Sequence, residues 1–227
     1  MYNPASFRTE DRDEMAAIMR AARLPILVSA SATGLEATHL PLCYTPDPGP
    51  YGRLVGHMAR ANKHWHALRD GAATMVIFQA DDFYVSPSWY ATRRETGRVV
   101  PTWNYQAVHV AGKVTVIDDP ARLHAIVAAL TDHHEASRAT PWRVDDAPAD
   151  YVAAQLKAIV GIELSITSLI GKRKLSQNRP LADRHGVIAG LRAAGETGAA
   201  SLMQALEDHG AAPADRSDPA PSLPPDR

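Results

Sequence analysis

The segment from Gly56 to Asn62 combines residue types that bind anions. His57 and Arg60 carry nitrogen donors, Asn62 adds a side-chain amide, and Gly56 lets a ligand approach the backbone closely. The segment follows an apolar run and leads into a predicted helix, whose N-terminal end carries a partial positive charge. These features predict a phosphate-binding site at a strand-to-helix join. The alternative, in which His57 and Arg60 only mark a solvated helix start, stays open.

Four other segments are richer in polar and aromatic residues than β-structure requires. They are 37–41, 85–90, 100–105 and 171–178, and each falls at a predicted strand end or turn. Their candidate binding residues are Thr38, His39, Ser86, Ser88, Trp89, Thr102, Trp103, Asn104, Lys174, Ser176 and Gln177. The aromatic rings could instead be ordinary core residues, and His39 could be a hydrogen-bonded structural histidine.

Several well-known site patterns are absent from the sequence. Neither G-x-G-x-x-G nor G-x-x-x-x-G-K-[ST] occurs, so neither a Rossmann dinucleotide site nor a P-loop is indicated. The run 132–135 contains metal-binding residue types, but adjacent residues on a helix face different directions, so we predict no metal site. The only cysteine, Cys43, cannot form an intrachain disulfide or a cysteine-based zinc site.

The charge balance predicts no general affinity for nucleic acid. The 24 lysines and arginines are matched by 25 aspartates and glutamates, so a DNA contact would need a local basic patch. The densest basic run is 172–174, which is a weak signal. Residues 1–23 carry charges throughout and lack the apolar run of a secretory signal or membrane span. We therefore expect a cytoplasmic protein with no membrane partner.

Short β-branched and aromatic runs separated by Gly, Pro and Asp predict a mainly β protein with flanking helices, built on a β-barrel of six to seven strands. The expected strands are 26–31, 35–44, 53–58, 73–79, 83–86, 103–117 and 159–170. Gly161 lies inside the last of these and could mark a β-bulge.

Helical patterns lie before, within and after the strands. Residues 9–23 place Met15, Ile18, Met19 and Ala22 on one face, with Thr9 as a plausible cap. Asp119-Pro120 is a strong helix start. Further helices are expected at 59–69, 149–157, 181–194 and 199–209. We predict one domain over residues 1–195, a C-terminal helix over 196–210, and a disordered tail over 211–227.

The five polar segments, taken in their order along the chain and together with the opening Met1-Tyr2-Asn3-Pro4 and Phe7, resemble the PaiB family of FMN-binding negative transcriptional regulators. The strings at 101–105 and 174–178 are the most unusual. The resemblance extends from Met1 to about Leu191. It implies a flavin-binding split barrel, related to the pyridoxamine-phosphate oxidase fold, that pairs as a homodimer with flavin sites between subunits.

The candidate residues suit such a cofactor. A flavin ring needs flat apolar walls and a few hydrogen-bonding groups at its polar edge, which the aromatic and polar residues of the four segments can supply. Lys174, Ser176 and Gln177 could reach either the ring or the phosphate. The resemblance implies a regulator and possible contact with DNA; the alternative is an FMN-dependent oxidoreductase that acts on a small molecule with a nicotinamide donor. The sequence does not separate a regulator from an enzyme, because flavin itself performs redox chemistry.

Overall fold

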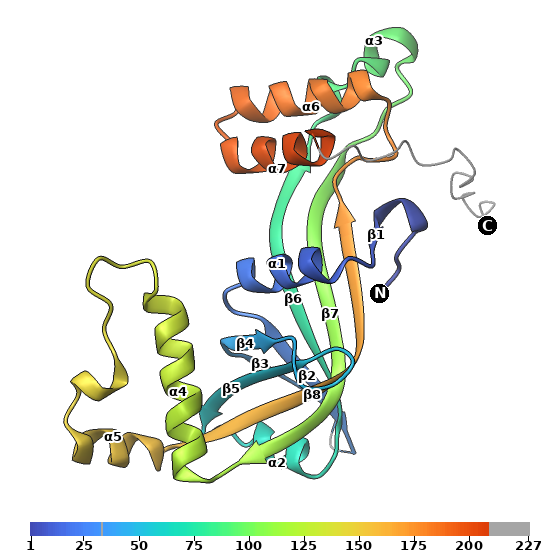
Figure 1. Ribbon diagram of the computed structural model, residues 1–227. Helices are drawn as coiled ribbons and strands as arrows, with labels where there is room; N and C mark the ends of the chain where they lie inside the picture. Colours follow the sequence, from blue (N-terminus) through green and yellow to red (C-terminus); the bar gives the residue numbers. More distant parts are fainter. Residues whose placement is uncertain (33, 209–227) are drawn as a thin grey trace. The chain divides into compact units, whose positions relative to one another are not determined.

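The computed structural model describes residues 1–32 and 34–208, whose strands form one eight-stranded sheet (Figure 1). The strand order is β3-β2-β6-β7-β8-β5-β4, and β1 pairs with β8. The pairs β2–β3, β2–β6, β4–β5 and β5–β8 are antiparallel. The strands are β1 (Arg8–Thr9), β2 (Ile26–Ser31), β3 (Gly34–His39), β4 (Leu42–Thr45), β5 (Arg53–Ala59), β6 (Ala73–Val85), β7 (Thr102–Ile117) and β8 (Ile159–Lys174).

Three strand predictions differ from the structure. The predicted strand 35–44 is divided into β3 and β4 around Leu40 and Pro41, because proline lacks the N–H that a strand ladder needs. The predicted strands 73–79 and 83–86 are one continuous strand, β6, in which Asp81 and Asp82 are exposed instead of forming a turn. With the two-residue strand β1, the described residues contain eight strands rather than six or seven.

The chain forms two compact units. Unit 1 contains Met1 and residues 9–80 and 106–172; unit 2 contains residues 2–8, 81–105 and the described residues from 173 onward. The predicted division at residue 195 stays a prediction, although α6 (Leu181–Ala193) and α7 (Thr197–Asp208) share one apolar cluster in unit 2. The predicted tail 211–227 lies outside the described residues.

The core of unit 1 follows the period-2 pattern of its strands. In β5, Leu54, Gly56 and Met58 are buried and alternate with half-buried residues. Helix α1 (Arg12–Ala21) buries Met15, Ile18 and Met19 of the predicted face against this core, and Ala22, directly after the helix, is buried there too. Its cap is Asp11, whose carboxylate accepts from the N–H groups of Asp13 and Glu14. The prediction of Thr9 as the cap was therefore wrong: Thr9 belongs to β1, and its hydroxyl donates to Glu14.

Helix α4 (Pro120–Glu135) starts at the predicted Asp119-Pro120, and the Asp119 carboxylate accepts from the N–H of Arg122 at 2.8 Å. Its apolar residues Leu123 and Ile126 form a buried cluster with Ile117 at the end of β7, and the helix lies against β4 and β5. Gly161 does not form a bulge, because it pairs in register with His57. A Cβ at Gly161 would lie 3.0–3.1 Å from those three side chains, so close packing of α4 explains this glycine.

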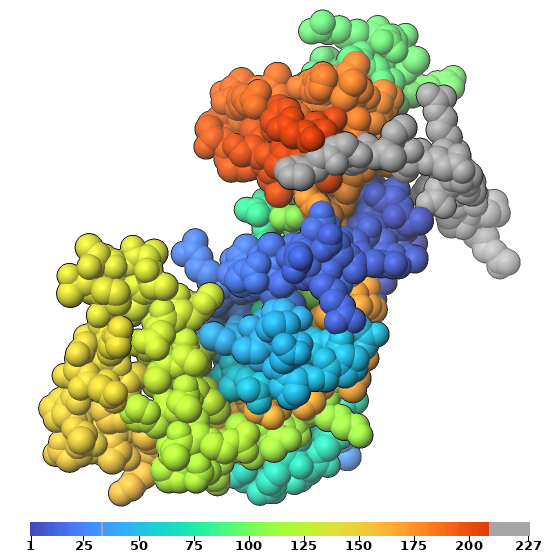
Figure 2. Space-filling view, viewed as in Figure 1, coloured from blue at the N-terminus to red at the C-terminus, as the bar shows by residue number. Residues whose placement is uncertain are grey.

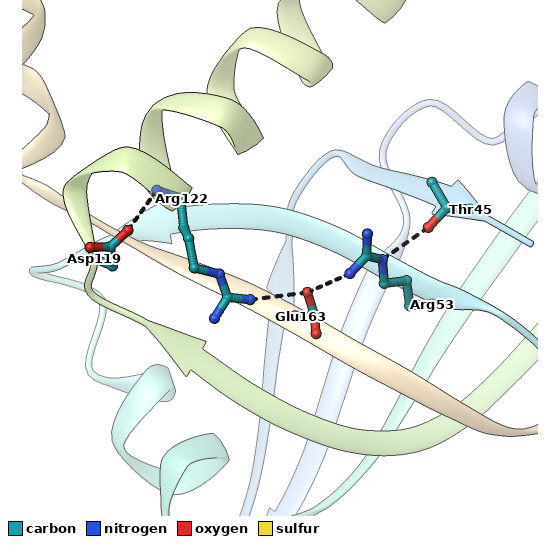
Figure 3. A network of polar contacts seen from close by, with 5 residues as sticks. All are labelled: Thr45, Arg53, Asp119, Arg122 and Glu163. Atoms are coloured by element: carbon teal, nitrogen blue, oxygen red, sulfur yellow. Dashed lines mark hydrogen bonds and ion pairs between the residues drawn. The ribbon is translucent and has the colours of Figure 1, made fainter. Parts of the chain in front are cut away.

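An ionic network also joins α4 to the sheet of unit 1 (Figure 3). One carboxylate oxygen of Glu163 on β8 accepts from Arg122 of α4 at 3.2 Å and from Arg53 of β5 at 3.1 Å. Arg53 also donates to Thr45 of β4. Because the Glu163 side chain is only 19% exposed, water screens this network less than an ordinary surface pair. The network therefore links α4 to β8 and β5, and through Arg53 to β4.

Unit 2 has its own apolar cluster, formed by the end of β6 together with α6 and α7. Helices α6 and α7 lie next to each other in the space-filling view (Figure 2). Arg184 of α6 and Glu207 of α7 form a largely buried ion pair at 3.2 Å. The other elements within residues 1–32 and 34–208 are η1 (Ala5–Phe7), η2 (Pro87–Trp89) and α3 (Thr92–Thr96) in unit 2, and α2 (His64–Arg69), η3 (Val144–Asp146) and α5 (Ala149–Leu156) in unit 1. The predicted helix 59–69 is shorter, because Ala59 ends β5 and a turn precedes α2.

Candidate functional site

The predicted phosphate-binding segment forms a tight corner between β5 and α2. The N–H of Arg60 donates to the carbonyl of Ala158 at 2.8 Å, and the N–H of Asn62 donates to the carbonyl of Ala59 at 2.9 Å. The indole nitrogen of Trp65 donates to the carbonyl of Arg60 at 3.0 Å. Backbone and side-chain bonds thus hold the corner in one conformation.

The Arg60 guanidinium already has protein partners. Its Nε donates to the Lys157 carbonyl at 3.0 Å, and its Nη2 donates to the Ile159 carbonyl at 2.9 Å and to the Asp118 carboxylate. The hydrogen bond from Arg60 lowers the pKa of Asp118. Among the described residues Nη1 has no partner, so one edge of the guanidinium is available to an anion that can compete with Asp118.

A buried histidine that the sequence did not single out organises the other side of this corner. His64 is 1% exposed; its Nε2 lies 2.7 Å from the Ser29 hydroxyl and its Nδ1 lies 2.8 Å from the Thr38 hydroxyl. Asn62 donates to the Thr38 hydroxyl at 3.1 Å and accepts from the N–H of His64. Burial lowers the pKa of His64, so the neutral imidazole fits this environment. Thr38 and Asn62 therefore support His64 in this structure.

Three further candidates in unit 1 lie on strands β5 and β3. A Cβ at Gly56 would lie 2.6 Å from the Pro41 carbonyl oxygen, so the close approach that requires a glycine is made by the chain itself. His57 is half-buried, its Nδ1 has no hydrogen-bond partner among the described residues, and burial lowers its pKa. His39 is exposed at the end of β3, where it pairs with Ile26. A flavin contact by any of them stays a prediction.

A shallow depression of about 390 Å³ lies in unit 1 beside the corner. Its lining residues are Trp65, Arg69, Val114, Thr115, Val116 and Asp118. The Arg69 guanidinium lies 5.3 Å from the centre of the Trp65 ring, and His66 stacks on that ring at 3.7 Å. The volume falls within the range of small-molecule sites. Trp65 and Asp118 both bond to Arg60 and so connect the depression to the corner. Its lining residues come from separate parts of the sequence, so no local pattern predicts this depression.

In unit 2 the structure brings residues of segment 100–105 together with Lys174 and Ser176 of segment 171–178. Asn104 is fully buried and exchanges hydrogen bonds with the Ser176 hydroxyl at 3.0 and 3.2 Å. The Lys174 ammonium donates to the Thr102 hydroxyl and to the Trp103 carbonyl. Ser176 has a φ of 64°, in the left-handed region that few non-glycine residues adopt. Strain of this kind is often found near functional positions.

We call Tyr84, Thr102, Trp103 and Lys174 the Trp103 surface. Trp103 is 56% exposed and Tyr84 is 46% exposed. Their rings meet edge to face, with centroids 5.9 Å apart, and the Lys174 ammonium is held at the Trp103 carbonyl. The combination of exposed rings and a positioned cation can bind a flat, anionic molecule by stacking and charge.

The remaining candidates in unit 2 serve local structure. Trp89 packs closely on two glycines of α6. A Cβ at Gly190 would lie 2.4 Å from the Trp89 ring, and one at Gly186 would lie 2.1 Å from the Trp89 carbonyl oxygen. Ser86 caps η2 by accepting from the N–H of Ser88, and their hydroxyls lie 2.7 Å apart. Gln177 closes the turn after β8 by accepting from the Leu175 N–H and donating to the Arg173 carbonyl.

Within residues 1–32 and 34–208 the structure contains no group of three side chains arranged to hold a metal ion. None of the helices in these ranges combines the length and apolar character needed to cross a membrane.

Comparison with known proteins identifies relatives along most of the chain. Residues 1–168 match the family described as "Putative FMN-binding domain". The chain is 30% identical over 208 residues to the protease synthase and sporulation protein PAI 2 of Bacillus subtilis, covering 92% of this chain and 97% of that protein. An uncharacterised protein of Aspergillus fumigatus is 33% identical over 191 residues, covering 70% of this chain and 73% of that protein.

Among solved structures, the fold resembles the FAD and heme binding protein from Mycobacterium smegmatis. The TM-score is 0.56 at 18% identity, with 74% of this chain and 73% of that chain covered. At this identity the likeness concerns the fold alone. The predicted mainly β split barrel with flanking helices is confirmed. The family match ends at residue 168, before the segment 171–178 that contains Lys174.

Proposed function

Because this chain belongs to the PaiB family of FMN-binding domains, we propose that it is a homodimeric, FMN-binding regulator whose flavin occupancy or redox state changes its interactions. The observation that carries the proposal is the identity of 30% to PAI 2, which extends over 97% of that protein rather than over one motif. The predicted family and the predicted cofactor, FMN, are confirmed. The regulatory role is the step that needs an experiment.

The Trp103 surface is the part of unit 2 that fits a flavin best. Trp103 and Tyr84 offer exposed apolar rings, and flavin is flat and partly apolar. The Lys174 ammonium can donate to a carbonyl of the ring edge or to a phosphate oxygen. When bound, FMN supplies redox chemistry, so this chain does not need an acid–base pair of its own. The residues of this surface bind and orient the ligand.

The β5–α2 corner fits the phosphate under one condition. Arg60 presents Nη1 as a donor, but the Asp118 carboxylate next to it repels a phosphate. A phosphate therefore binds there only if it displaces part of the Arg60–Asp118 pair. Replacement of Asp118 by asparagine removes the repulsion and distinguishes a phosphate-binding Arg60 from a purely structural one.

The second candidate function is an FMN-dependent oxidoreductase that uses a nicotinamide donor and a small substrate. The exposure of Trp103 favours it, because a flavin bound on an open surface can be reached by a second molecule. The two candidate functions share the FMN cofactor, and they differ in whether the protein converts a substrate catalytically.

The deciding experiment begins with the absorbance spectrum of the purified chain after FMN addition and desalting. Flavin bands at about one per chain establish cofactor binding, and a colourless protein contradicts it. NADH and NADPH are then added to the holoprotein. Fast bleaching with reoxidation in air supports the oxidoreductase, whereas an inert flavin with salt-sensitive DNA binding that changes on flavin reduction supports the regulator.

Two accompanying proposals concern assembly and location. A homodimer fits the family resemblance, and light scattering at micromolar concentration should give twice the 24.5 kDa chain mass. A monomer would contradict it. A cytoplasmic location fits a chain with Cys43 as its only cysteine, and cell fractionation tests it.

A further inference from the structure

Three exposed arginines gather on the short helix α3 and the loop that follows it. Arg93 and Arg94 belong to α3, and Arg98 comes directly after Gly97; all three arginines are at least partly exposed. The stretch 91–101 contains these three arginines and one acidic residue, Glu95, a formal excess of two positive charges. We call Arg93, Arg94 and Arg98 the arginine turn.

The guanidinium groups of the arginine turn have no ion pair or hydrogen bond among the described residues, although their backbone groups are bonded. Several arginines of unit 1 form internal ion pairs instead. In unit 1, Arg53 and Arg122 share Glu163, and Arg60 pairs with Asp118. The three charges of the turn thus face solvent instead of forming internal ion pairs.

A buried carboxylate fixes the backbone that carries the turn. Asp183 of α6 is 0% exposed, and its two oxygens accept from the N–H and the hydroxyl of Thr92 at 2.8 and 2.9 Å. Tyr90, which precedes α3, is buried beneath the Arg179 guanidinium, 4.8 Å from the ring centre. Gly97, with a φ of 68°, ends α3 by donating to the Arg93 carbonyl. The turn therefore needs little further backbone ordering when it meets a partner.

The chemistry of the turn fits phosphate oxygens. A guanidinium presents a planar fork of donors that matches phosphate geometry, and all three cations here are arginines. An anionic membrane would also attract them, but membrane-binding surfaces add bulky apolar residues. Val100 is the one large apolar residue of stretch 91–101 that is exposed. The composition therefore favours a polyanion with regularly spaced phosphates over a lipid surface.

We propose that the arginine turn is a contact for the phosphate backbone of duplex DNA. The inference rests on the proposed regulatory function and names its partner and the surface that meets it. Since the chain as a whole has a formal net charge of −1, such binding depends on this local cluster and is sensitive to salt.

The test uses the full-length, FMN-loaded chain and a fluorescein-labelled duplex of mixed sequence, followed by anisotropy at several salt concentrations. The variant is Arg93→Ala/Arg94→Ala/Arg98→Ala. Its affinity should fall roughly tenfold or more, and the slope of log K against log salt should decrease by about 0.9 for each phosphate that is no longer neutralised. The matched control, Arg20→Ala/Arg23→Ala/Arg138→Ala, changes the net charge equally in unit 1 and should bind DNA like the unchanged chain.

A charge-preserving variant, Arg93→Lys/Arg94→Lys/Arg98→Lys, guards against misfolding and should keep most of the salt slope. Equal loss of affinity in the alanine variant and the control would overturn the inference, since net charge alone would then explain binding. Binding to phosphatidylserine vesicles but not to the duplex would overturn the choice of partner. FMN retention is measured on the same samples, so loss of the flavin function is seen separately from loss of DNA binding.

Discussion

Candidate polar residues behave differently in the two units. In unit 1, Thr38, Asn62 and Arg60 bond to atoms of the same unit and hold its corner together. In unit 2, Trp103 and the arginine turn are exposed on a backbone fixed by buried contacts. Residue types that suggest a binding site thus build structure in the corner of unit 1. In unit 2 some of them, such as Asn104 and Ser176, also bond internally, and others are presented at the surface. The comparison predicts that substitutions in the corner of unit 1 lower stability, and that substitutions at the exposed residues of unit 2 lower binding.

The largest expected effect is on stability in unit 1. His64→Ala removes the partner of two hydroxyls, Ser29 and Thr38, and leaves a cavity, so the free energy of unfolding should fall by about 3 kcal/mol. Urea unfolding measures this. Lys63→Ala, one position earlier and exposed, is the control and should change the value by less than about 0.5 kcal/mol. A His64→Ala protein that is stable but no longer retains FMN would contradict the structural role of this corner and would indicate a role in flavin binding.

In unit 2 the packing of Trp89 provides a test of structure rather than binding. Gly190→Ala puts a methyl group 2.4 Å from the Trp89 ring and should lower the unfolding free energy by about 2 kcal/mol. Gly198→Ala in α7 meets no atom within 4 Å and should cause no loss. Equal stability of the two variants would show that Trp89 can move away from α6, and would make its ring available to a flavin again.

The role of Arg60 decides whether the corner of unit 1 is only structural. If Nη1 binds the flavin phosphate, Arg60→Ala should weaken FMN binding roughly tenfold, and Asp118→Asn should strengthen it. Flavin fluorescence titration measures both. If Asp118→Asn leaves FMN affinity unchanged, Arg60 only ties β5 to the start of β8.

For the Trp103 surface we expect a change in binding without a change in stability. Trp103→Ala removes an exposed ring that meets Tyr84, so FMN affinity should fall about fivefold while the unfolding midpoint stays constant. Trp142→Ala, another exposed tryptophan, in unit 1, is the control and should bind FMN normally. A normal affinity in Trp103→Ala would remove this surface from the proposed site.

The smallest effect is a dependence of stability on pH. Burial lowers the pKa values of His57, His64 and His109 below the ordinary value of 6.5. The unfolded chain therefore takes up protons first, and stability should be full above about pH 6.5 and decline as the pH falls below it. Thermal unfolding across this range measures the decline. A His64→Gln variant should show a shallower decline of stability with falling pH. A decline equal to that of the unchanged chain would mean that His64 does not contribute to the pH dependence of stability.

The sequence alone was sufficient for the fold class, the family, the cofactor and several element boundaries. β2 matches its predicted range, and Asp119 caps α4 as predicted. These features depend on local patterns: strand alternation, a cap followed by proline, and unusual residue strings. The division at Pro41 was missed although proline lacks the N–H that a strand ladder needs, which is a local signal. The continuity of β6 through two aspartates was missed because no local pattern shows it.

Site residues show the same limit more sharply. The sequence shows small or polar residues, such as Gly56, Thr38 and Arg60, near the predicted strand ends. We predicted ligand contacts from these residue types. Only the tertiary structure shows that Pro41 fills the space at Gly56, that Thr38 forms a hydrogen bond with His64, and that Asp118 pairs with Arg60. The type of a residue determines which groups its side chain can bond to. The folded chain determines which of those groups lies within bonding distance, because the partners come from distant positions that no local pattern connects.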